Sequence, residues 1–452
     1  MKRPPMNSNP HGGSEPATAP SEADEAFKAA EELYSQGNFR DAVRKYTEAL
    51  QGDPEHAQAL FKLALIAFQS GHSQRSVDFL QRAIEIDPRN FDYEFQLGFV
   101  LQEQKELTKA LRCFERVVDL HPRHGRALLK IGNIQLALEQ REAAAMAFQR
   151  ALLIEPALRT AMDNPKVPAA TRKEIRTANK LLAAKHRSLA QETLDALQRY
   201  PAEQCQRIDT AFRYLTGDEQ KRYSHPQQRP EYLLFPNMPA RPWYEREEFD
   251  WVARVEAAYP EIKEEYVNLV RDQAEFVPYI QPSREDMETI TTPGGTDFTS
   301  LLNSPEWTAF HLNKAGRIEQ NCARCPKTAA IMDSLPLAEA AAYMPEVFFS
   351  VLQPDAHIIP HFGQMNIRLT AHLGLIIPNG CSIRAGDEIR SWAEGKILVF
   401  DDSFEHEAWN RGDSDRIVLI FEVWNPDLNE AEIEGLQHFF KTRHDWLEKC
   451  SP

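Results

Sequence analysis

The sequence contains no long apolar stretch. No uninterrupted run of apolar residues approaches the roughly 20 that a membrane-spanning helix needs. The first residues, MKRPPMNSNPHGG, also lack the apolar centre of a secretory signal peptide. We therefore expect a soluble, cytoplasmic protein that has no membrane partner.

The chain is also poor in positive charge. It has 52 Lys and Arg against 67 Asp and Glu, which gives a formal net charge of -15 at pH 7. Recognition of phosphate depends on clustered basic side chains that displace counterions. This charge balance argues against nucleic acid as a partner.

Cysteines are few and mostly far apart. Of the six, only Cys322 and Cys325, in the segment CARC, have the close spacing of a metal or redox pair. A structural zinc site needs a second such pair, which the sequence lacks, so we expect inert or weakly redox-active thiols. The scattered pattern is typical of a reducing compartment.

The chain is long, because 452 residues exceed one ordinary hydrophobic core and indicate two or more domains. Residues 1–22 are rich in Pro, Ser, Gly and Ala and cannot bury enough apolar area to fold. We expect them to form a disordered tail.

A period of 34 residues runs through the next part of the chain. Prolines, two columns of small residues and one column of bulky residues all recur at this step. They are Pro54, Pro88, Pro122 and Pro156; Ala30, Ala64, Gly98 and Gly132; Ala49, Ala83, Val117 and Ala151; and Tyr46, Leu80, Phe114 and Phe148. Small residues let paired helices approach and bulky ones fill the gap, whereas an irregular bundle has no reason to keep a period. The pattern resembles four tetratricopeptide repeats over residues 23–158, without the tryptophan often found early in that repeat. By resemblance, such an array binds peptides or a partner protein.

Residues 159–225 are expected to connect the repeats to a second domain. The stretch 170–200 consists largely of helix formers and stops at Pro201, which predicts a long helix that caps the last repeat. Prolines and aromatic residues become frequent from about residue 226. We therefore expect a second domain over residues 226–452.

Short strands dominate this domain from about residue 345. Five segments rich in β-branched and aromatic residues are separated by Pro, Gly, Asn and Asp. They are EVFFSVLQ, RLTAHLGLIIP, EIRSWAEG, KILVFD and RIVLIFEVW. Because no helices intervene, these segments predict an antiparallel sandwich or barrel.

Four of the 14 histidines, at positions 357, 361, 372 and 406, lie in this strand-rich region. A lone histidine is more often a hydrogen-bonded core or surface residue than a ligand, so clustering alone says little. His361 follows a strand-ending proline and His406 lies in a polar turn, so we expect both at one mouth of the barrel. Arg416 opens the following strand, where a buried guanidinium needs an anion. A dicarboxylic cosubstrate would supply one.

The same region carries a set of longer segments that occur together. They are FSVLQPDAHIIPHFG, RLTAHLGLIIP, WAEGKILVFDDSFEHEAWN and RIVLIFEVWNP, with FPNMPARPWYE and WTAFHLNKAGR upstream. Over residues 230–430 they resemble the aspartyl/asparaginyl β-hydroxylase family of iron(II)- and 2-oxoglutarate-dependent oxygenases. The resemblance implies a double-stranded β-helix, a jelly-roll or cupin-like fold, with flanking helices. With the all-α tetratricopeptide solenoid it gives a multidomain α + β chain. Animal members also place such repeats before the oxygenase but carry a membrane anchor, so we expect a soluble, bacterial relative without one.

The resemblance implies a metal site with two protein ligands, His361 and His406, which would hold Fe(II). Most such oxygenases add a carboxylate two residues after the first histidine, where this chain has Gly363. The family it resembles uses two histidines only, with water in the vacated position, so a glycine there fits. Asp402 matches a position associated with substrate binding.

The resemblance also implies a site for 2-oxoglutarate. Arg416 and Ser350 would bind its distal carboxylate, and His372 would contact its other end. The family often has an arginine where this chain has Thr370; Arg368 points to the same face of an extended strand and could replace that contact. The alternatives are that Arg416 forms an ordinary salt bridge within the protein and that the Ser350 hydroxyl is hydrogen-bonded within its strand.

The implied reaction consumes 2-oxoglutarate and O2, yields succinate and CO2, and hydroxylates an unactivated C–H bond. The expected target is a peptide or protein, at the β-carbon of Asp or Asn, because the repeats are a polypeptide-binding scaffold. Hydroxylation of an acyl chain or a small molecule is one alternative. Another is a catalytically inactive interaction protein, which Thr370 would motivate and which the intact histidines and arginine oppose.

Overall fold

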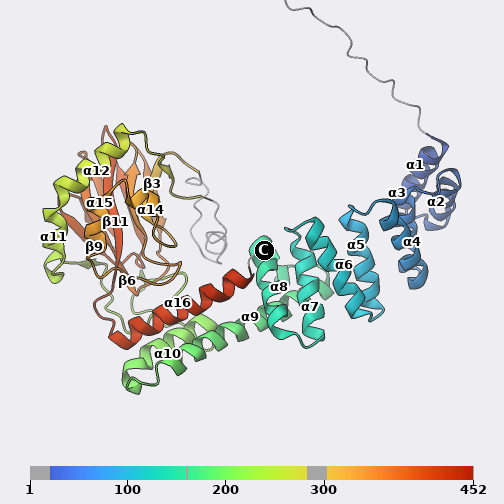
Figure 1. Cartoon of the computed structure of the whole chain (residues 1–452), viewed down its shortest axis with the longest axis horizontal. Coiled ribbons are helices and arrows are strands. Elements are labelled where there is room, and N and C mark those ends of the chain that lie inside the picture. The colour runs from blue at the N-terminus through green and yellow to red at the C-terminus, as the bar shows by residue number, and fades with distance from the viewer. Residues whose placement is uncertain (1–20, 159–160, 282–302, 451–452) are drawn as a thin grey trace, which may run out of the picture. The chain divides into compact units, whose positions relative to one another are not determined.

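A computed structural model describes residues 21–158, 161–281 and 303–450, which form two compact units (Figure 1). The first unit is Met1–Gln140 and the second is Arg141–Pro452. The expected tail, residues 1–22, lies almost entirely outside the described residues. So do residues 282–302 of the expected second domain. The division at Gln140 falls inside the fourth expected repeat.

The first unit is helical throughout its described part, as the 34-residue period predicts. Its helices follow one another as helix–turn–helix pairs. They are α1 (Glu22–Ser35), α2 (Phe39–Gly52), α3 (Ala57–Gln69), α4 (Ser73–Ile86), α5 (Phe91–Glu103), α6 (Leu107–Leu120) and α7 (Gly125–Ala137).

Close helix packing explains the repeated small and bulky residues. Ala30, Ala64, Tyr46 and Phe114 are completely buried. Gly98 in α5 packs so tightly on α6 that a Cβ atom added to it would lie 3.0 Å from the ring of Phe114. The predicted helical solenoid is therefore confirmed at the level of its contacts.

The turns inside the pairs repeat as well. Gly37, Gly71, Lys105 and Glu139 are spaced by 34 residues and have φ angles of 77°, 80°, 66° and 64°. This left-handed conformation is free of strain only for glycine, which the first two turns supply. The backbone period is thus kept even where the residue type changes.

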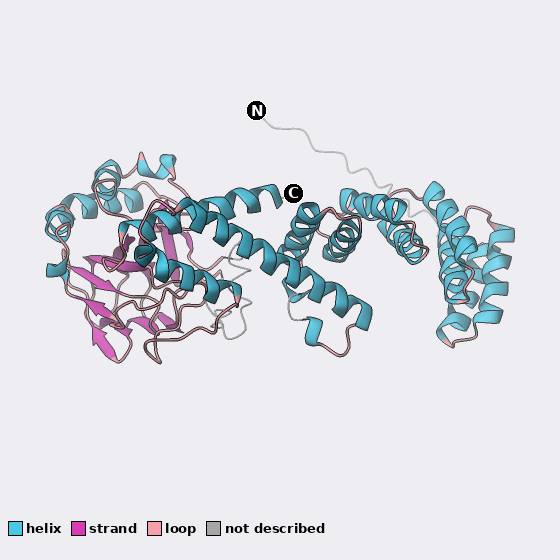
Figure 2. Cartoon of the chain, turned by 90° about the horizontal axis from the view of Figure 1, so that it is seen from below, coloured by secondary structure: helices cyan, strands magenta, loops and turns pink. Residues whose placement is uncertain are grey.

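The second unit has a helical part and a strand-rich part. Its helices are α8 (Arg141–Ile154), α9 (Ala169–Ala196), α10 (Ala202–Thr216), α11 (Val252–Ala257), α12 (Tyr259–Arg271), α14 (Glu319–Cys322), α15 (Pro326–Met332) and α16 (Glu430–Cys450). The predicted long helix over 170–200 is α9. Helix α16 lies along α9 and α10, as both whole-chain views show (Figures 1 and 2). None of the helices in the described ranges is long and apolar enough to cross a membrane.

The strands form two sheets in which every pairing is antiparallel, and the strands are confined to this unit (Figure 2). The larger sheet has the order β1 (Trp243–Tyr244), β9 (Ile397–Phe400), β6 (Arg368–Ile376), β11 (Arg416–Trp424), β4 (Val347–Leu352), β3 (Trp307–Asn313), β2 (Val277–Pro278). The smaller has the order β5 (His357–His361), β10 (His406–Asn410), β7 (Cys381–Ala385), β8 (Glu388–Arg390). The predicted antiparallel sheet domain is confirmed.

Alternation along the strands divides the apolar side chains between two cores. One face of the larger sheet packs on α11, α12, α14 and α15, with Phe349, Leu419 and Phe421 at its centre. The other face packs on the smaller sheet through residues such as Val418 and Ile383. Polar residues on this second face are therefore enclosed between the two sheets.

Candidate active site

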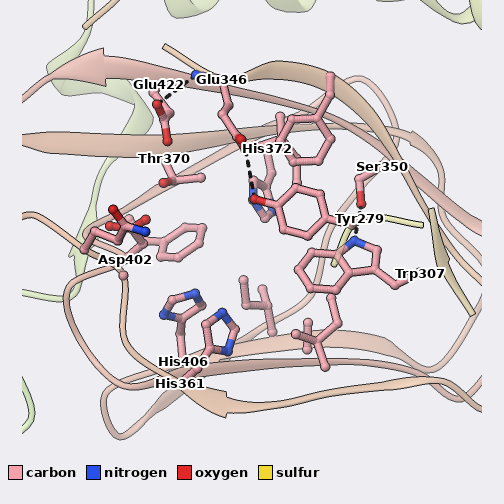
Figure 3. A pocket seen from close by; sticks show the side chains of 18 of the residues that line it. Tyr279, Trp307, Glu346, Ser350, His361, Thr370, His372, Asp402, His406 and Glu422 are labelled. Carbon is pink, nitrogen blue, oxygen red and sulfur yellow. Dashed lines mark hydrogen bonds between the residues drawn. The ribbon is translucent and has the colours of Figure 1, made fainter. Parts of the chain in front are cut away.

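A cavity of about 280 Å³ lies between the two sheets of the second unit (Figure 3). All of the residues that the sequence assigns to the metal, the cosubstrate or the substrate line it, although they come from six different strands and loops. They are Ser350, His361, Arg368, His372, Asp402, His406 and Arg416. His357 is not among the lining residues; it bonds to Glu407 at 2.9 Å and stacks on Trp409.

Two histidines face each other across neighbouring strands. His361 ends β5 and His406 begins β10, and the two are register partners with ring centroids 4.0 Å apart. The expectation that one follows a strand end and the other lies in a turn is wrong. Pro360 is accommodated inside β5 because that strand is at the edge of its sheet, where a missing N–H is tolerated. The polar segment HEAWN becomes a strand because it pairs on both sides, with β5 and β7.

The backbone fixes the tautomer of both rings. His361 Nδ1 lies 2.7 Å from the carbonyl of Ile359, and His406 Nδ1 lies 2.9 Å from that of Phe404. A carbonyl can only accept, so each Nδ1 carries the proton and each Nε2 keeps its lone pair. Burial lowers the pKa of His361 to about 3 and that of His406 to about 4. Both rings are therefore neutral near pH 7, which is the form that binds metals.

Gly363 is packed beneath the carboxylate of Asp402. The N–H of Gly363 donates to the backbone carbonyl of Asp402 at 2.7 Å. A Cβ atom added to Gly363 would come closer than 3.0 Å to Asp402 Cγ and both carboxylate oxygens. The loop is held by Asp401, which accepts from Gln228 Nε2 at 2.9 Å and from the N–H of Ser403 at 2.9 Å. The glycine thus leaves room for a carboxylate that a different part of the chain provides.

The donor set fits a metal with two imidazole ligands. Over the described ranges, no group of three or more His, Cys, Asp or Glu residues is arranged to hold a metal ion. His361 and His406 offer two neutral nitrogens, each oriented by a carbonyl on its far side, which is the usual support of a metal-binding histidine. Cys322 and Cys325 are buried elsewhere, and burial raises the pKa of Cys325 to about 12.

Arg416 is buried in the cavity without an anion. It opens β11, is 2 % exposed, and has no carboxylate within ion-pair distance among the described residues. Its Nε–H has no hydrogen-bond partner, and its guanidinium lies 5.0 Å from the ring centre of Trp392. Burial lowers the pKa of Arg416 to about 10, so the side chain still carries its charge at pH 7.

Two indole N–H groups donate hydrogen bonds to polar side chains of the cavity and fix which of their atoms can donate to a ligand. Trp392 Nε1 donates to His372 Nδ1 at 3.2 Å. Burial lowers the pKa of His372 well below its ordinary value, so the neutral ring carries its proton on Nε2 and can donate from there. Trp307 Nε1 donates to Ser350 Oγ at 3.1 Å, which leaves the hydroxyl proton for another acceptor. Figure 3 shows this serine and tryptophan on one side of the cavity.

Arg368, by contrast, already has anionic neighbours. Its Nε is 3.0 Å from Glu422 Oε1 and its Nη2 is 3.8 Å from Asp402 Oδ2. The contact with Glu422 is one of charge, because the Nε–H is not aligned on that oxygen as in a hydrogen bond. Burial raises the pKa of Glu422, and Arg368 opposes that rise. The two arginines of the cavity therefore differ in whether their charge is compensated.

Sequence reasoning missed several residues that shape the cavity. They are Tyr279, Trp307, Glu346, Trp392 and Glu422. One had a readable signal: Glu422 is a single acid in an apolar strand, six residues from Arg416 and hence on the same face. The others come from segments far apart in the chain, so only the fold brings them to the site.

Comparison with known proteins identifies two families along the chain. Residues 256–426 match the sequence profile of the family described as Aspartyl/Asparaginyl beta-hydroxylase, and residues 27–91 and 95–164 match that of the tetratricopeptide repeat. A solved structure of YrrB, described as a TPR protein with an unusual peptide-binding site, is 19% identical with a TM-score of 0.30; it aligns over 36% of this chain and 86% of its own.

Relatives of known name align with the second unit. The human aspartyl/asparaginyl beta-hydroxylase is 39% identical over 139 residues, which are 30% of this chain and 18% of that protein. The ornithine lipid ester-linked acyl 2-hydroxylase of Rhizobium tropici is 35% identical over 189 residues, which are 41% of this chain and 61% of that protein. The alignments span less than two thirds of either relative. The chain thus carries a domain of the aspartyl/asparaginyl β-hydroxylase family together with tetratricopeptide repeats.

Proposed function

We propose that this protein is an Fe(II)- and 2-oxoglutarate-dependent dioxygenase that hydroxylates a peptide or protein. The target in this proposal is the β-carbon of an aspartyl or asparaginyl residue, as in the hydroxylase family that the second unit matches. The two facing antiparallel sheets fit the double-stranded β-helix, or jelly-roll, fold expected for such an enzyme.

The observation that carries the proposal is the uncompensated guanidinium of Arg416 in the same cavity as two neutral, preoriented imidazoles. A buried arginine without an anion is costly, so the site calls for a ligand that brings a carboxylate. The distal carboxylate of 2-oxoglutarate fits this need, because Ser350 Oγ can add a hydroxyl donor beside the guanidinium. His372 can donate from Nε2 toward the other end of the cosubstrate.

His361 and His406 would hold the iron. When bound, Fe(II) supplies oxygen activation: 2-oxoglutarate and O2 are converted to succinate and CO2, and one oxygen atom enters the substrate C–H bond. The protein's own part is to keep both imidazoles neutral and correctly turned, which the carbonyls of Ile359 and Phe404 do.

The walls of the cavity keep water away from the reacting centre. Trp307, Phe348, Trp392 and Phe400 are buried aromatic residues that line it. They leave few polar groups near the histidines, and Asp402 is one of these. Its carboxylate above Gly363 is well placed to orient a substrate group beside the metal ligands.

The repeats support a polypeptide as the target. Tetratricopeptide arrays offer extended surfaces to a partner chain, so we propose that the first unit recruits the substrate or a partner protein. A second candidate is hydroxylation of a lipid acyl chain, which is favoured by the 35% identity to the acyl 2-hydroxylase of Rhizobium tropici. Supplying a peptide library and an acyl lipid in parallel, and measuring succinate above the substrate-free level, separates the two.

A titration of 2-oxoglutarate tests the central assignment. Arg416→Ala removes a charge-assisted contact of about 1.5–3 kcal/mol, so affinity for 2-oxoglutarate should fall by roughly one to two orders of magnitude. Arg416→Lys should recover part of it, because it keeps the charge without the planar fork. The matched variant Arg368→Gln alters the compensated arginine; it should lower stability, because it breaks a buried ion pair, but its folded form should bind the cosubstrate within about twofold of wild type.

Binding is measured by calorimetry with Mn(II), and turnover is measured as succinate with Fe(II). If Arg368→Gln loses 2-oxoglutarate binding while Arg416→Ala keeps it, the cosubstrate lies at the opposite end of the cavity. If the wild-type chain binds neither Mn(II) nor 2-oxoglutarate and makes no succinate, the dioxygenase proposal fails and the alternative of a catalytically inactive interaction protein is favoured.

A further inference from the structure

Helix α9 carries a concentration of positive charge in an acidic chain. Between residues 166 and 187 there are seven Lys and Arg residues and one acid, Glu174, whereas the whole chain has a net charge of -15. The balance of charge is therefore reversed over this segment.

Three of these basic side chains form one exposed face of the helix. Ile175 and Leu182 are buried on the other side, where α9 packs on α8, α10 and α16 (Figure 1). Lys173, Arg176 and Lys180 are exposed. At about 3.6 residues per turn they lie within about 60° of one another around the helix and span about 10 Å along it. We call these three residues the basic face.

No acid neutralises the basic face. Among the residues that the structure describes, its three side chains have no carboxylate within ion-pair distance, whereas Lys185 and Arg187 further along α9 both do. Arg176 Nη1 donates to the backbone carbonyl of Met162 at 3.3 Å, which adds no negative charge. Glu174 is half-buried and lies about 100° around the helix from the nearest member of the face. The basic face thus keeps its positive charge.

Helix stability does not account for this arrangement. Arg176 and Lys180 are four residues apart, and like charges at that spacing destabilise a helix. A glutamate at position 176 would instead pair with Lys180 and stabilise the helix. The basic face is better explained by an anionic binding partner.

The length of the face favours a short anionic segment. Exposed charges act over a Debye length of about 8 Å at physiological ionic strength, so a small anion on α9 is influenced mainly by the basic face. A nucleic acid or a membrane surface extends well beyond the length of the face. It would therefore also meet the negative charge of the rest of the chain, which repels it.

The exposed apolar residues also argue against a membrane. A helix that lies on a membrane inserts large apolar side chains beside its basic residues. None of the exposed large apolar side chains in the described ranges belongs to α9; they are Phe39, Ile86, Leu120, Tyr223, Val267, Val270 and Ile389. A polypeptide therefore fits this face better than a lipid surface does.

The spacing of the face matches an extended acidic segment. In an extended chain, alternate side chains point to the same side and lie about 6–7 Å apart. Successive members of the basic face are separated by three and four residues, or about 4.5 and 6 Å along the helix axis. Carboxylates at every second position of a bound segment can therefore reach all three basic side chains.

We propose that the basic face of α9 binds an acidic segment of a polypeptide partner, in which Asp or Glu occupies alternate positions. The face belongs to the second compact unit, so this contact is separate from any that the repeats of the first unit make. Such a surface acts whether or not the cavity is catalytic, and the inference thus goes beyond the proposed function.

Two peptides that differ in charge test the preference. The full chain is titrated against a ten-residue peptide of alternating Asp and Ser and one of alternating Asn and Ser, which carry the same rhodamine label, and fluorescence anisotropy is measured. At about 0.1 M salt the aspartyl peptide should bind at least about fivefold more tightly, and the difference should largely disappear at about 1 M salt, where exposed charges are screened. Equal affinities at the lower salt concentration would overturn the inference.

Substitutions locate the binding surface. An α9 variant with all three residues of the basic face replaced by Gln should bind the aspartyl peptide within about twofold of the asparaginyl peptide. The matched control, Arg75→Gln with Arg89→Gln and Arg123→Gln, removes the same charge from exposed positions of the first unit and should bind as wild type does. All of these side chains are exposed, so circular dichroism should show unchanged helical content in both variants. Wild-type affinity in the α9 variant, or an equal loss in the control, would contradict the assignment to α9.

Other polyanions are titrated in parallel with wild type and the α9 variant. The probes are vesicles that contain phosphatidylglycerol and a single-stranded oligothymidine. If either binds through the basic face more tightly than the aspartyl peptide at the same salt concentration, the choice of a polypeptide is wrong; weak or variant-independent binding of both supports it. None of these measurements depends on turnover, so their failure would leave the proposed reaction untouched.

Discussion

Three histidines share the cavity, and their hydrogen bonds give them different chemistry. His361 and His406 donate from Nδ1 to backbone carbonyls, so each keeps a lone pair on Nε2. His372 instead accepts at Nδ1 from Trp392, so its Nε2 carries a proton. The first two are therefore suited to bind a metal, and the third is suited to donate to an anion.

Removal of either metal-binding candidate should abolish metal binding. With two protein ligands there is no spare donor, so His361→Ala and His406→Ala should each lose high-affinity Mn(II) binding, measured by electron paramagnetic resonance, and succinate formation. His357→Ala is the matched control, because this histidine lies in the same strand but pairs with Glu407 outside the cavity. Tight Mn(II) binding by either of the two variants would refute the assignment.

Gly363 gives a second prediction at this scale. A methyl group at this position would overlap the Asp402 carboxylate, so Gly363→Ala must displace Asp402 or the adjacent backbone. Displacement of a packed group costs about 1–3 kcal/mol, and urea unfolding should show a loss of that size. Gly412→Ala is a poor control because it is also crowded, and the φ of 126° at Gly316 strains any substitution there; Gly52→Ala is better, because a Cβ atom added to Gly52 would come no closer than 3.3 Å to its neighbour Ala23. An unchanged free energy of unfolding in Gly363→Ala would contradict this prediction and show that the loop with Asp402 can move at no cost.

At the scale of elements, three neighbouring strands of the larger sheet carry most of the polar residues of the cavity, whereas the two candidate metal ligands lie on the smaller sheet. Alternation puts Glu346, Phe348 and Ser350 on one face near β4, Arg368 and His372 on the same face of β6, and Arg416 and Glu422 on that of β11. Register then sets neighbours: His372 is opposite Ile420, and Ser350 is opposite Val418. Small shifts of register would exchange cavity and core residues.

Strand β3 buries a histidine that gives the fold a pH dependence. His311 is 6 % exposed, and its Nε2 has no hydrogen-bond partner among the described residues. Burial, together with Lys314, lowers its pKa from 6.5 to about 3. Below pH 6.5 the unfolded chain binds a proton that the folded chain refuses, so the free energy of unfolding falls as pH falls. Above pH 6.5 this contribution is absent.

We expect His311→Phe to weaken that dependence. One refused proton lowers the free energy of unfolding by about 1.4 kcal/mol per pH unit, or about 2 kcal/mol between pH 6.5 and 5. Urea unfolding at pH 7 and pH 5 should therefore show a loss smaller by about 2 kcal/mol in the variant than in wild type. His444→Gln, in α16, serves as the comparison; an equal loss in His311→Phe and wild type would contradict the buried, neutral state.

Local pattern predicted some of these elements and could not predict others. Strands β4, β6, β9 and β11 are visible in the sequence because they are buried on both faces and are rich in β-branched and aromatic residues. Strands β5 and β10 are short, β5 contains Pro360 and β10 is largely polar, and they form because β10 pairs with β5 on one side and with β7 on the other. The resemblance identifies His361 and His406 as candidate ligands, but the sequence does not predict that they are register partners on neighbouring strands. Only the fold brings Trp307 and Trp392 to the cavity. Their indole N–H groups donate to Ser350 and His372 and so orient the hydrogen-bond donors of those two side chains.

At the scale of the whole molecule, the cavity and the repeats belong to different compact units. Every residue that lines the cavity lies between 231 and 422, within the second unit. Helix α8 also belongs to that unit, although the 34-residue period assigns it to the repeats. It packs against α9 and α16, and Glu142 at its start pairs with Lys185 of α9 at 2.9 Å. The sequence period reflects the residue spacing within each helix pair, whereas the boundary between the units reflects which helices pack against each other.

Two truncated chains should separate these boundaries. A chain that begins at Arg141 keeps α8 and the whole cavity lining, so it should bind Mn(II) and 2-oxoglutarate as the full chain does. A chain that begins at residue 159, where the sequence period ends, removes the contacts of α8 with α9 and α16. Its melting temperature should be lower, by about 2–4 °C for each kcal/mol of packing lost. Calorimetric melting and 2-oxoglutarate titration of both chains give the answer. Equal melting temperatures would favour the boundary at residue 159, and loss of 2-oxoglutarate binding in the longer chain would show that the first unit is required to maintain the cavity.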